Sequence, residues 1–495
     1  MKKIYICTLT TLLLLGQMSC RKPNDFGPTN VDPGNTTKPI VSALLAQVEA
    51  NLGNYVSTNN LSQYGGEYAQ YFTETQYPGI STYSLPQLSF TGYYSGDLYD
   101  LQNIINLNQD KNSVAVAKIL QQFIFWEITD AWGDVPYSQA LQGLKSITPV
   151  YDKQEDIYKG ILSTLASVSF DGGAIPGDLI YNGDVASWKR AANSLSMLVA
   201  IQLSKKVPGA SDYAATAFKA ALAAGGITTN AQNLAISYPG SAFKDPWWNL
   251  YNGRTDFAES KVVTDLTAAR SDGRTVPFGG DFTDPNQVTG GTITSAIGIP
   301  PGLSRSDVTA FTTANPKWAL VMRADKRTET GTVVVISAAE VMLARAEALN
   351  LGWTTAAEEP TGLPNVYQSG IALSFEQWGL AAPAASYYTQ SNVLVTAPDN
   401  SPTGTNAINI ATQRYLASYP DGHAAWDIWR KSGFPTLVPA PGATNASGKI
   451  VRRFTYATSE FQTNEANVKA AVARELGPNA GTDSQDNTVW WDSAP

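Results

Sequence analysis

A single cysteine remains in the chain once its predicted export signal is removed, and this constrains the fold more than any other feature. The sequence has two cysteines, Cys7 and Cys20. Cys7 lies in an apolar run, residues 4–15, that follows Lys2 and Lys3 in the layout of an export signal. The run is too short to cross a bilayer as a helix, which takes about 20 residues. The exported chain therefore forms no intramolecular disulfide, and its stability must come from a large apolar core.

The end of the signal predicts a lipid anchor. The residues Gly16-Gln17-Met18-Ser19-Cys20 have the form of a bacterial lipoprotein cleavage site, with Gln17 where an aliphatic residue is usual. We expect residues 1–19 to be a signal peptide and Cys20 to be the acylated first residue of the mature protein. Residues 20–39 are rich in Pro, Gly, Asn and Thr and are expected to form a tether. An ordinary signal peptide that ends near a cysteine is the alternative.

The charge balance argues against nucleic acid as a partner. The net charge of the chain is −8, and loss of Lys2 and Lys3 with the signal takes it to −10. Such a surface repels a phosphate backbone, and basic clusters are limited to Arg430-Lys431 and Arg452-Arg453. No second apolar run approaches the length of a membrane span, so membrane attachment depends on the lipid at Cys20.

Helical periodicity and cap signatures predict a mostly α-helical domain over residues 40–495. Asp152, Asp184 and Ser337 are predicted helix caps, for helices that end near residues 167, 206 and 351. The strongly apolar pattern of residues 113–130 predicts a central helix. The remaining helices are expected at residues 40–57, 97–109, 211–223, 257–269, 365–378, 405–418, 422–431 and 460–475.

Two stretches depart from the helical pattern. Residues 64–96 hold many tyrosines separated by Pro, Gly and Ser, and we expect a non-helical loop there that is either functional or packed down as an Ω-like excursion. Between about 225 and 335, Gly, Pro, Thr and Asn dominate, which predicts an irregular, ligand-facing insertion. Residues 290–295 and 332–336 have short β-like patterns within it.

The aromatic content points to carbohydrate binding. The chain has 12 tryptophans and 23 tyrosines, and flat amphipathic rings on a neutral polar surface suit stacking against sugars. Core packing is expected to account for most of these rings, and for any single ring a place in the core is favoured over a place in a ligand platform. The ligand-binding candidates from the two irregular stretches are Tyr77, Tyr83, Tyr93, Trp247, Trp248, Tyr251 and Arg254. Whether Asp281 and Asp284 bind an ion is left open.

Most catalytic chemistries lack the residues they need. His423 is the single histidine, which excludes His/Cys zinc sites and Cys-His pairs, and we predict no metal, cofactor or catalytic residue. No G-x-S-x-G motif accompanies His423, which is expected to be a capping or surface residue. A carboxylate pair for glycoside hydrolysis, such as Glu127 and Asp130, remains open, although no pair is distinguished.

Several separate motifs resemble the SusD/RagB family of nutrient-binding outer-membrane lipoproteins. They are spread over nearly the whole length, and together they are specific. The matching segments are 30–34 (NVDPG), 129–137 (TDAWGDVPY), 151–158 (YDKQEDIY), 339–348 (AEVMLARAEA), 367–371 (YQSGI), 426–435 (WDIWRKSGFP) and 452–456 (RRFTY).

The resemblance implies a scaffold of tetratricopeptide-like helical hairpins in a right-handed solenoid, with minor β structure. It also implies a partner, a TonB-dependent transporter of the SusC type, to which such proteins deliver oligosaccharides or peptides. The motifs are scaffold in this family, so the resemblance assigns no binding residue. Arg21 and Lys22 stand where surface-displayed members usually carry acidic residues, so display on the exterior is the weaker expectation.

The predicted function is therefore binding without catalysis. We expect a lipid-anchored outer-membrane protein that captures glycans, or other nutrients, and passes them to a SusC-like transporter. A secreted glycoside hydrolase that uses a carboxylate pair is the rival hypothesis. A structural lid without a ligand of its own is the third.

Overall fold

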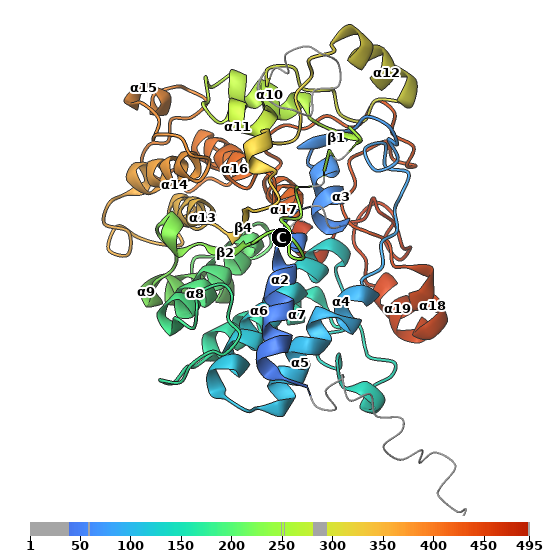
Figure 1. Cartoon of the computed structure of the whole chain (residues 1–495), viewed down its shortest axis with the longest axis vertical. Helices are drawn as coiled ribbons and strands as arrows, with labels where there is room; N and C mark the ends of the chain where they lie inside the picture. The colour runs from blue at the N-terminus through green and yellow to red at the C-terminus, as the bar shows by residue number, and fades with distance from the viewer. Residues whose placement is uncertain (1–38, 58–59, 249, 252, 281–294, 494–495) are drawn as a thin grey trace, which may run out of the picture. The chain divides into compact units, whose positions relative to one another are not determined.

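Helices form most of the regular structure, and short strands join segments that lie far apart in the chain (Figure 1). The computed structural model describes residues 39–57, 60–248, 250–251, 253–280 and 295–493. The segment Val41–Pro495 forms one compact unit. The predicted signal peptide, Cys20, all of the tether except its last residue, and Asp281 and Asp284 lie outside the described residues.

The helical elements follow one another along the whole unit. In the first half they are α2 (Val41–Tyr55), α3 (Asn60–Tyr68), α4 (Thr91–Ser95), α5 (Asp97–Leu107), α6 (Lys111–Trp132), α7 (Gln154–Ser167), α8 (Val185–Gln202) and α9 (Tyr213–Ala224). In the second half they are α10 (Lys261–Ala268), α11 (Thr275–Gly279), α12 (Arg305–Ala314), α13 (Ala338–Asn350), α14 (Leu363–Gln377), α15 (Ala385–Tyr388), α16 (Thr405–Ala417), α17 (Gly422–Ser432), α18 (Thr458–Thr463) and α19 (Glu465–Val472). The 3-10 turns are η3 (Gly143–Lys145), η4 (Leu203–Lys205), η5 (Asn230–Gln232), η6 (Ala324–Lys326) and η7 (Trp490–Asp492).

Two antiparallel strand pairs connect the helical regions. Strand β1 (Phe72–Glu74) pairs with β3 (Phe257–Glu259), with Phe72 opposite Glu259 and Glu74 opposite Phe257. Strand β2 (Leu234–Ser237) pairs with β4 (Thr332–Ile336), with an irregularity at the start of β2. The pattern at 332–336 was a correct prediction of a strand, whereas most of the predicted strand at 290–295 lies outside the described residues.

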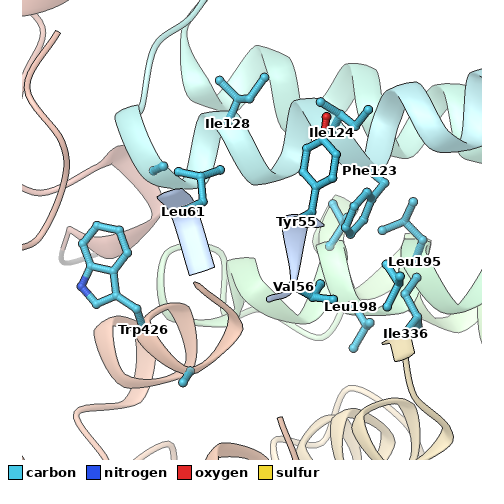
Figure 2. Close-up of a cluster of buried hydrophobic side chains, with 14 of the residues drawn as sticks. Tyr55, Val56, Leu61, Phe123, Ile124, Ile128, Leu195, Leu198, Ile336 and Trp426 are labelled. Atoms are coloured by element: carbon cyan, nitrogen blue, oxygen red, sulfur yellow. The ribbon is translucent and has the colours of Figure 1, made fainter. Parts of the chain in front are cut away.

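The core forms around α6, as its apolar pattern predicted. Nearly every residue of α6 is buried, and it packs against α5, α7 and α8. Each fully buried aliphatic side chain contributes roughly 1.5–3 kcal/mol, so this one helix supplies much of the stability that disulfides give to smaller exported domains. Figure 2 shows part of this core, with side chains from α2, α6, α8, β4 and α17: Tyr55, Phe123, Ile124, Leu195, Leu198, Ile336 and Trp426.

Two of the three predicted caps are confirmed. Asp184 accepts hydrogen bonds from the N–H groups of Ala186 and Ser187 at the start of α8. Ser337 and Glu340 form a full capping box at the start of α13. Asp152 does not cap α7, because its carboxylate accepts from the Tyr137 and Ser138 N–H groups of the preceding turn.

The predicted non-helical stretch at 64–96 is partly wrong, since α3 runs to Tyr68 and α4 covers Thr91–Ser95. Gly65 and Gly66 disfavour a helix in isolation. In the fold, however, a Cβ at Gly65 would lie 2.6 Å from the Gly422 carbonyl oxygen, so glycine allows α3 to pack directly on the start of α17. Tertiary packing therefore overrides the local preference.

Two predicted helices also have different bounds. The helix expected at 257–269 begins only at Lys261, because residues 257–259 form β3. The helix expected at 460–475 is divided into α18 and α19 at Asn464, whose ψ of 43° leaves the regular helical path. Within the described residues, no helix combines the length and the apolar character that crossing a membrane would require.

Candidate functional site

The β1–β3 pair brings together the two segments that carry the site. Beyond Glu74 and Phe257, the last residue pair of the ladder, the Thr75 N–H donates to the Asp256 carbonyl oxygen at 2.7 Å. The Thr75 hydroxyl donates to the Thr255 carbonyl oxygen. These bonds continue the pairing past Glu74. As a result, Tyr77 and Arg254, which are far apart in the sequence, lie at the same end of the ladder.

A buried carboxylate shapes the loop that carries Tyr77. One oxygen of Glu74 accepts from the Ile80 N–H at 2.9 Å, the Ser81 N–H at 3.2 Å and the Ser81 hydroxyl at 3.1 Å. Burial raises the pKa of Glu74, while these donors act in the opposite direction. The bonds close the loop on its own strand, which leaves Tyr77 at the tip.

Tyr77 is 67% exposed, although most of the other aromatic residues that the structure describes are buried. The Arg254 guanidinium lies 5.5 Å from the ring centroid and pairs with Asp256 at 2.6 Å. Arg305, at the start of α12, donates to the Gln76 carbonyl oxygen. We call Gln76, Tyr77, Arg254, Asp256 and Arg305 the Tyr77 platform.

The platform combines a flat ring with polar groups around it. The exposed ring face can stack on the apolar face of a sugar, and the nearby guanidinium and carboxylate groups can donate to or accept from hydroxyls. Hydrogen bonding to Asp256 raises the pKa of Arg254, so the guanidinium stays charged. Arg305 was not among the predicted site residues, because no helix was expected at 305–314. A cap signal was present in the sequence, since Ser304 precedes α12 and accepts from the Asp307 N–H in its first turn.

Three of the predicted binding rings are buried: Tyr83, Tyr251 and Trp247. Tyr83 is 1% exposed, and its hydroxyl accepts from the Ala440 N–H at 3.0 Å. Tyr251 is 5% exposed; its hydroxyl donates to the Phe257 carbonyl oxygen at 2.9 Å and accepts from the Val321 N–H at 2.8 Å. Burial raises the pKa of Tyr83 to about 12. The hydroxyl groups of the two tyrosines bond to the backbone of the surrounding fold.

Trp247 and the two partly buried rings, Trp248 and Tyr93, have different surroundings. Trp247 is 5% exposed and packs edge-on against Phe72, with ring centroids 6.1 Å apart. Trp248 is half-buried, with the Lys244 ammonium 4.1 Å from its ring centroid. Tyr93 lines a shallow depression of about 380 Å³ beside α2 and α5. Thus the structure joins Tyr77 to Arg254 and distributes the remaining candidates over the core and other surfaces.

The recognisable motifs meet in the interior. Glu347 of α13 accepts from the Lys431 ammonium of α17 at 2.6 Å and pairs with Arg414 of α16. Burial acts against the charge, but Lys431 and Arg414 hold the pKa of Glu347 below its usual value. This Glu347 network joins three helices, so Glu347 and Lys431 of the motifs serve the scaffold, as the family resemblance implied.

His423 also belongs to the scaffold. It is buried in the first turn of α17, so the surface position considered from the sequence is wrong, and its Nδ1 lies 2.8 Å from Glu127. Burial opposes its charged form, but Asp427 and Glu127 raise the pKa of His423 to about 10. The described residues contain no group of three or more His, Cys, Asp or Glu side chains placed to hold a metal ion.

Comparisons with known proteins agree in fold over nearly the whole chain. A SusD-like family model, described as starch-binding and associating with the outer membrane, matches residues 33–457. A solved chitin-binding protein is 25% identical, with a TM-score of 0.73, over 92% of this chain and 100% of that one. A chitin-binding SusD homologue from Flavobacterium johnsoniae is 21% identical, with a TM-score of 0.74, over 92% and 98% of the two chains.

A SusD homologue from Bacteroides uniformis is 24% identical to this chain, with a TM-score of 0.75, over 91% of this chain and 99% of that one. No curated protein matches the sequence. The solved structures therefore establish the fold, and the family model establishes the relationship.

Proposed function

Because the chain belongs to the SusD-like family of outer-membrane glycan-binding proteins, we propose that it captures a glycan by stacking a sugar ring on the Tyr77 platform. Proteins of this family bind their ligands without catalysis. The glycoside hydrolase considered from the sequence is therefore not carried forward, and the predicted carboxylate pair of Glu127 and Asp130 has structural partners instead: His423 bonds to the first and Tyr158 to the second.

The observation that carries this proposal is the exposure of Tyr77. A ring that is 67% exposed gains no stability from the core. Its loop is nevertheless closed by three hydrogen bonds to Glu74, and Arg254 lies against the ring. An exposed aromatic residue on a loop held by hydrogen bonds suits stacking on a sugar, because little conformational entropy is lost on binding.

Two glycan classes come first as ligands. The family description names starch, and the 25% identical relative is named as chitin-binding. Both polymers present neutral pyranose rings with hydroxyl groups at their edges, which matches one flat ring with donors and acceptors around it. Peptides remain a second class. We propose no direct contact with the platform ligand for the other five predicted rings, because the structure places them in the core or beside other partners: Trp247, Trp248, Tyr251, Tyr83 and Tyr93.

The remainder of the proposal concerns the membrane anchor, the transport partner and the helical scaffold of the protein. We propose that a lipid on Cys20 holds it at the outer membrane, facing outward, and that it delivers its glycan to a SusC-like TonB-dependent transporter. Packed helix pairs such as α8 with α9 and α13 with α14 support a tetratricopeptide-like, right-handed solenoid over residues 40–495, with an irregular ligand-facing insertion at about 225–335. Incorporation of labelled fatty acid that is lost in Cys20→Ala tests the anchor.

The stacking proposal is tested by calorimetry with malto-oligosaccharides and chito-oligosaccharides. We expect Tyr77→Ala to weaken binding about five- to tenfold, because an aromatic contact contributes about 1 kcal/mol or more. The free energy of unfolding should stay within about 0.5 kcal/mol of the wild type, as for other surface substitutions. Tyr99→Ala is the matched control, since Tyr99 is 49% exposed on α5 and lies outside the platform.

Three outcomes contradict the proposal. Equal affinities for the wild type and Tyr77→Ala would place the ligand elsewhere. A large stability loss in Tyr77→Ala would show that the ring is part of the core. Heats that stay at the dilution level with every glycan and peptide would favour the structural lid.

A further inference from the structure

The depression that Tyr93 lines, between α2 and the α4–α5 segment, lies apart from the Tyr77 platform. Figure 1 shows α4 on a different part of the compact unit from β1, and the two places share no residue. The depression has a volume of about 380 Å³, within the range of about 300–1,000 Å³ that is usual for ligand pockets. We call it the α4 depression; the lining residues used below are Asn51, Asn54, Tyr55, Gly92, Tyr93 and Asp97.

Hydrogen bonds and ring packing hold the lining of the α4 depression in place. The Asp97 carboxylate, at the start of α5, accepts from the Asn51 amide at 2.9 Å and from the Tyr55 hydroxyl at 2.9 Å. The ring of Tyr55 lies 5.6 Å from that of Tyr93 and 6.0 Å from that of Phe123 in α6. Because these contacts exist without a ligand, binding here would cost little conformational entropy.

Two polar groups of the depression are left for a ligand. Asn54 and Tyr93 are half-buried, and within the described part of the chain no residue hydrogen-bonds to the Asn54 amide or to the Tyr93 hydroxyl. Both groups keep accessible surface, so a molecule in the depression can reach them. The amide offers two donors and an acceptor, and the hydroxyl offers one donor and two lone pairs.

Glycine leaves one edge of the depression without a side chain. A Cβ at Gly92, in α4, would meet no atom within 4 Å, so the packing of the fold does not require glycine there. Gly96 differs, because a Cβ at that position would lie 2.9 Å from the Gly92 carbonyl oxygen. The open edge at Gly92 therefore gives room to a ligand beside Tyr93.

The charge of the α4 depression favours a neutral ligand. Among the described residues that line it, Asp97 alone carries a charge, so an anion such as a phosphate would be repelled. A metal ion has too few ligands, since the described residues contain no group of three or more His, Cys, Asp or Glu side chains placed to hold one. Amide, hydroxyl and carboxylate groups bond well to sugar hydroxyls, and the Tyr93 ring offers an apolar surface.

From this geometry we propose that the α4 depression is a second carbohydrate site, which holds a sugar ring of a neutral saccharide beside Tyr93 through Asn54 and Asp97. It rests on the proposed function only in the choice of a saccharide, because none of its residues belongs to the Tyr77 platform. Two weak sites on one protein hold a glycan that is long enough to reach both more firmly than either site alone.

The experiment uses Tyr77→Ala as the starting protein, so that platform stacking does not contribute. Glucose, N-acetylglucosamine, maltotriose and chitotriose are the probes; saturation-transfer NMR detects binding and calorimetry measures it. We expect at least one probe to bind Tyr77→Ala. Adding Asn54→Leu should weaken this binding about fivefold or more, because leucine has a similar size but no polar group. Adding Gly92→Leu should weaken it about tenfold or more, because the new side chain occupies space at the open edge.

Gly172→Leu is the matched control for Gly92→Leu. A Cβ at Gly172 also meets no atom within 4 Å, and this exposed glycine lies outside the α4 depression. Its affinity in the Tyr77→Ala background should be unchanged. Circular dichroism establishes that each variant is folded, and Asn54→Leu and Gly92→Leu test the site independently of each other.

Three results overturn the proposal. In the first, the probes bind the wild type but not Tyr77→Ala, which preserves the proposed function and removes the second site. In the second, Gly92→Leu and Gly172→Leu bind a probe equally well. In the third, no probe binds any of these proteins, which also contradicts the proposed function for these sugars. Equal binding by the wild type and Tyr77→Ala, with loss in Gly92→Leu, would instead support the α4 depression and contradict stacking on the platform.

Discussion

The Glu347 network and the Tyr77 platform both join distant segments through charged side chains, but they differ in what surrounds them. Glu347, Lys431 and Arg414 are enclosed by α13, α16 and α17, and they come from the segments by which the chain resembles its family or lie beside them. Arg254 and Asp256 pair at the surface, beside a ring that water still reaches. The difference teaches that the recognisable residues of this chain hold the scaffold together, whereas the residues that we propose to face a ligand lie on loops between them.

The strongest test of this contrast is a substitution in the buried Glu347 network. Glu347→Ala leaves Lys431 and Arg414 buried without their carboxylate, and we expect the free energy of unfolding to fall by about 3–5 kcal/mol. Urea denaturation measures this change. Glu465→Ala is the control, because the Glu465–Lys469 pair is exposed, and it should show no measurable change. Equal stability of the two variants would mean that the Glu347 network does not hold the helices.

The buried carboxylate of Asp245 gives a pH-dependent change in stability that is smaller than the loss expected for Glu347→Ala. Burial raises the pKa of Asp245 to about 6 from an ordinary 3.8. In the unfolded chain the group loses its proton at lower pH, so the folded protein loses stability as the pH rises from about 4 towards 7. Asp245→Asn removes this cost while keeping an acceptor for the Trp247 N–H.

We therefore expect the stability advantage of Asp245→Asn over the wild type to grow by about 2–3 kcal/mol between pH 4 and pH 7. Denaturation of both proteins across this range measures it. Because the two proteins share all other titrating groups, their difference isolates Asp245. A difference that stays constant with pH would show that the carboxyl titrates normally.

The third prediction concerns the link between scaffold and platform. Glu74→Ala removes the acceptor for the Ile80 and Ser81 N–H groups, which should cost about 1–3 kcal/mol of stability. It should also weaken glycan binding as much as Tyr77→Ala does, because the loop no longer fixes the ring. Glu74→Gln, which keeps one acceptor oxygen, should retain most of the affinity in calorimetry. Normal binding by Glu74→Ala would show that Tyr77 does not need its loop.

The smallest expected effect is that of salt on binding. A neutral sugar that stacks on Tyr77 displaces no counterions, so its affinity should change less than about twofold between 50 and 500 mM NaCl. Calorimetry at both concentrations measures this. An affinity that falls tenfold would indicate an anionic ligand held by Arg254 and Arg305, and would place the platform among charge-driven sites.

Local signals predicted the scaffold well. The apolar run of α6 and the caps at Asp184 and Ser337 depend on residues within a few positions of each other, so the sequence contains the whole argument. The cap predicted at Asp152 was wrong because the competing donors, on Tyr137 and Ser138, come from a turn that folds back on it. Only the fold reveals such competition.

The site was less predictable for the same reason. Tyr77 and Arg254 were both chosen for their residue types, but their contact depends on the β1–β3 pairing of two distant segments. Tyr83 and Tyr251 have the same types and similar surroundings in sequence, yet backbone groups of Ala440 and Val321 bond to their hydroxyls in the interior. Residue type identifies candidates, and long-range pairing decides among them.

The three-residue β1–β3 ladder has an evolutionary consequence. The loop that carries Tyr77 and the segment that carries Arg254 are encoded in separate stretches of the gene, and the β1–β3 ladder joins them through main-chain bonds that do not depend on side-chain identity. Residues beyond the ladder, Tyr77 included, can therefore change without disturbing the pairing. New side chains at the tip beyond Glu74 would alter the surface of the proposed platform while the framework of helices is inherited intact.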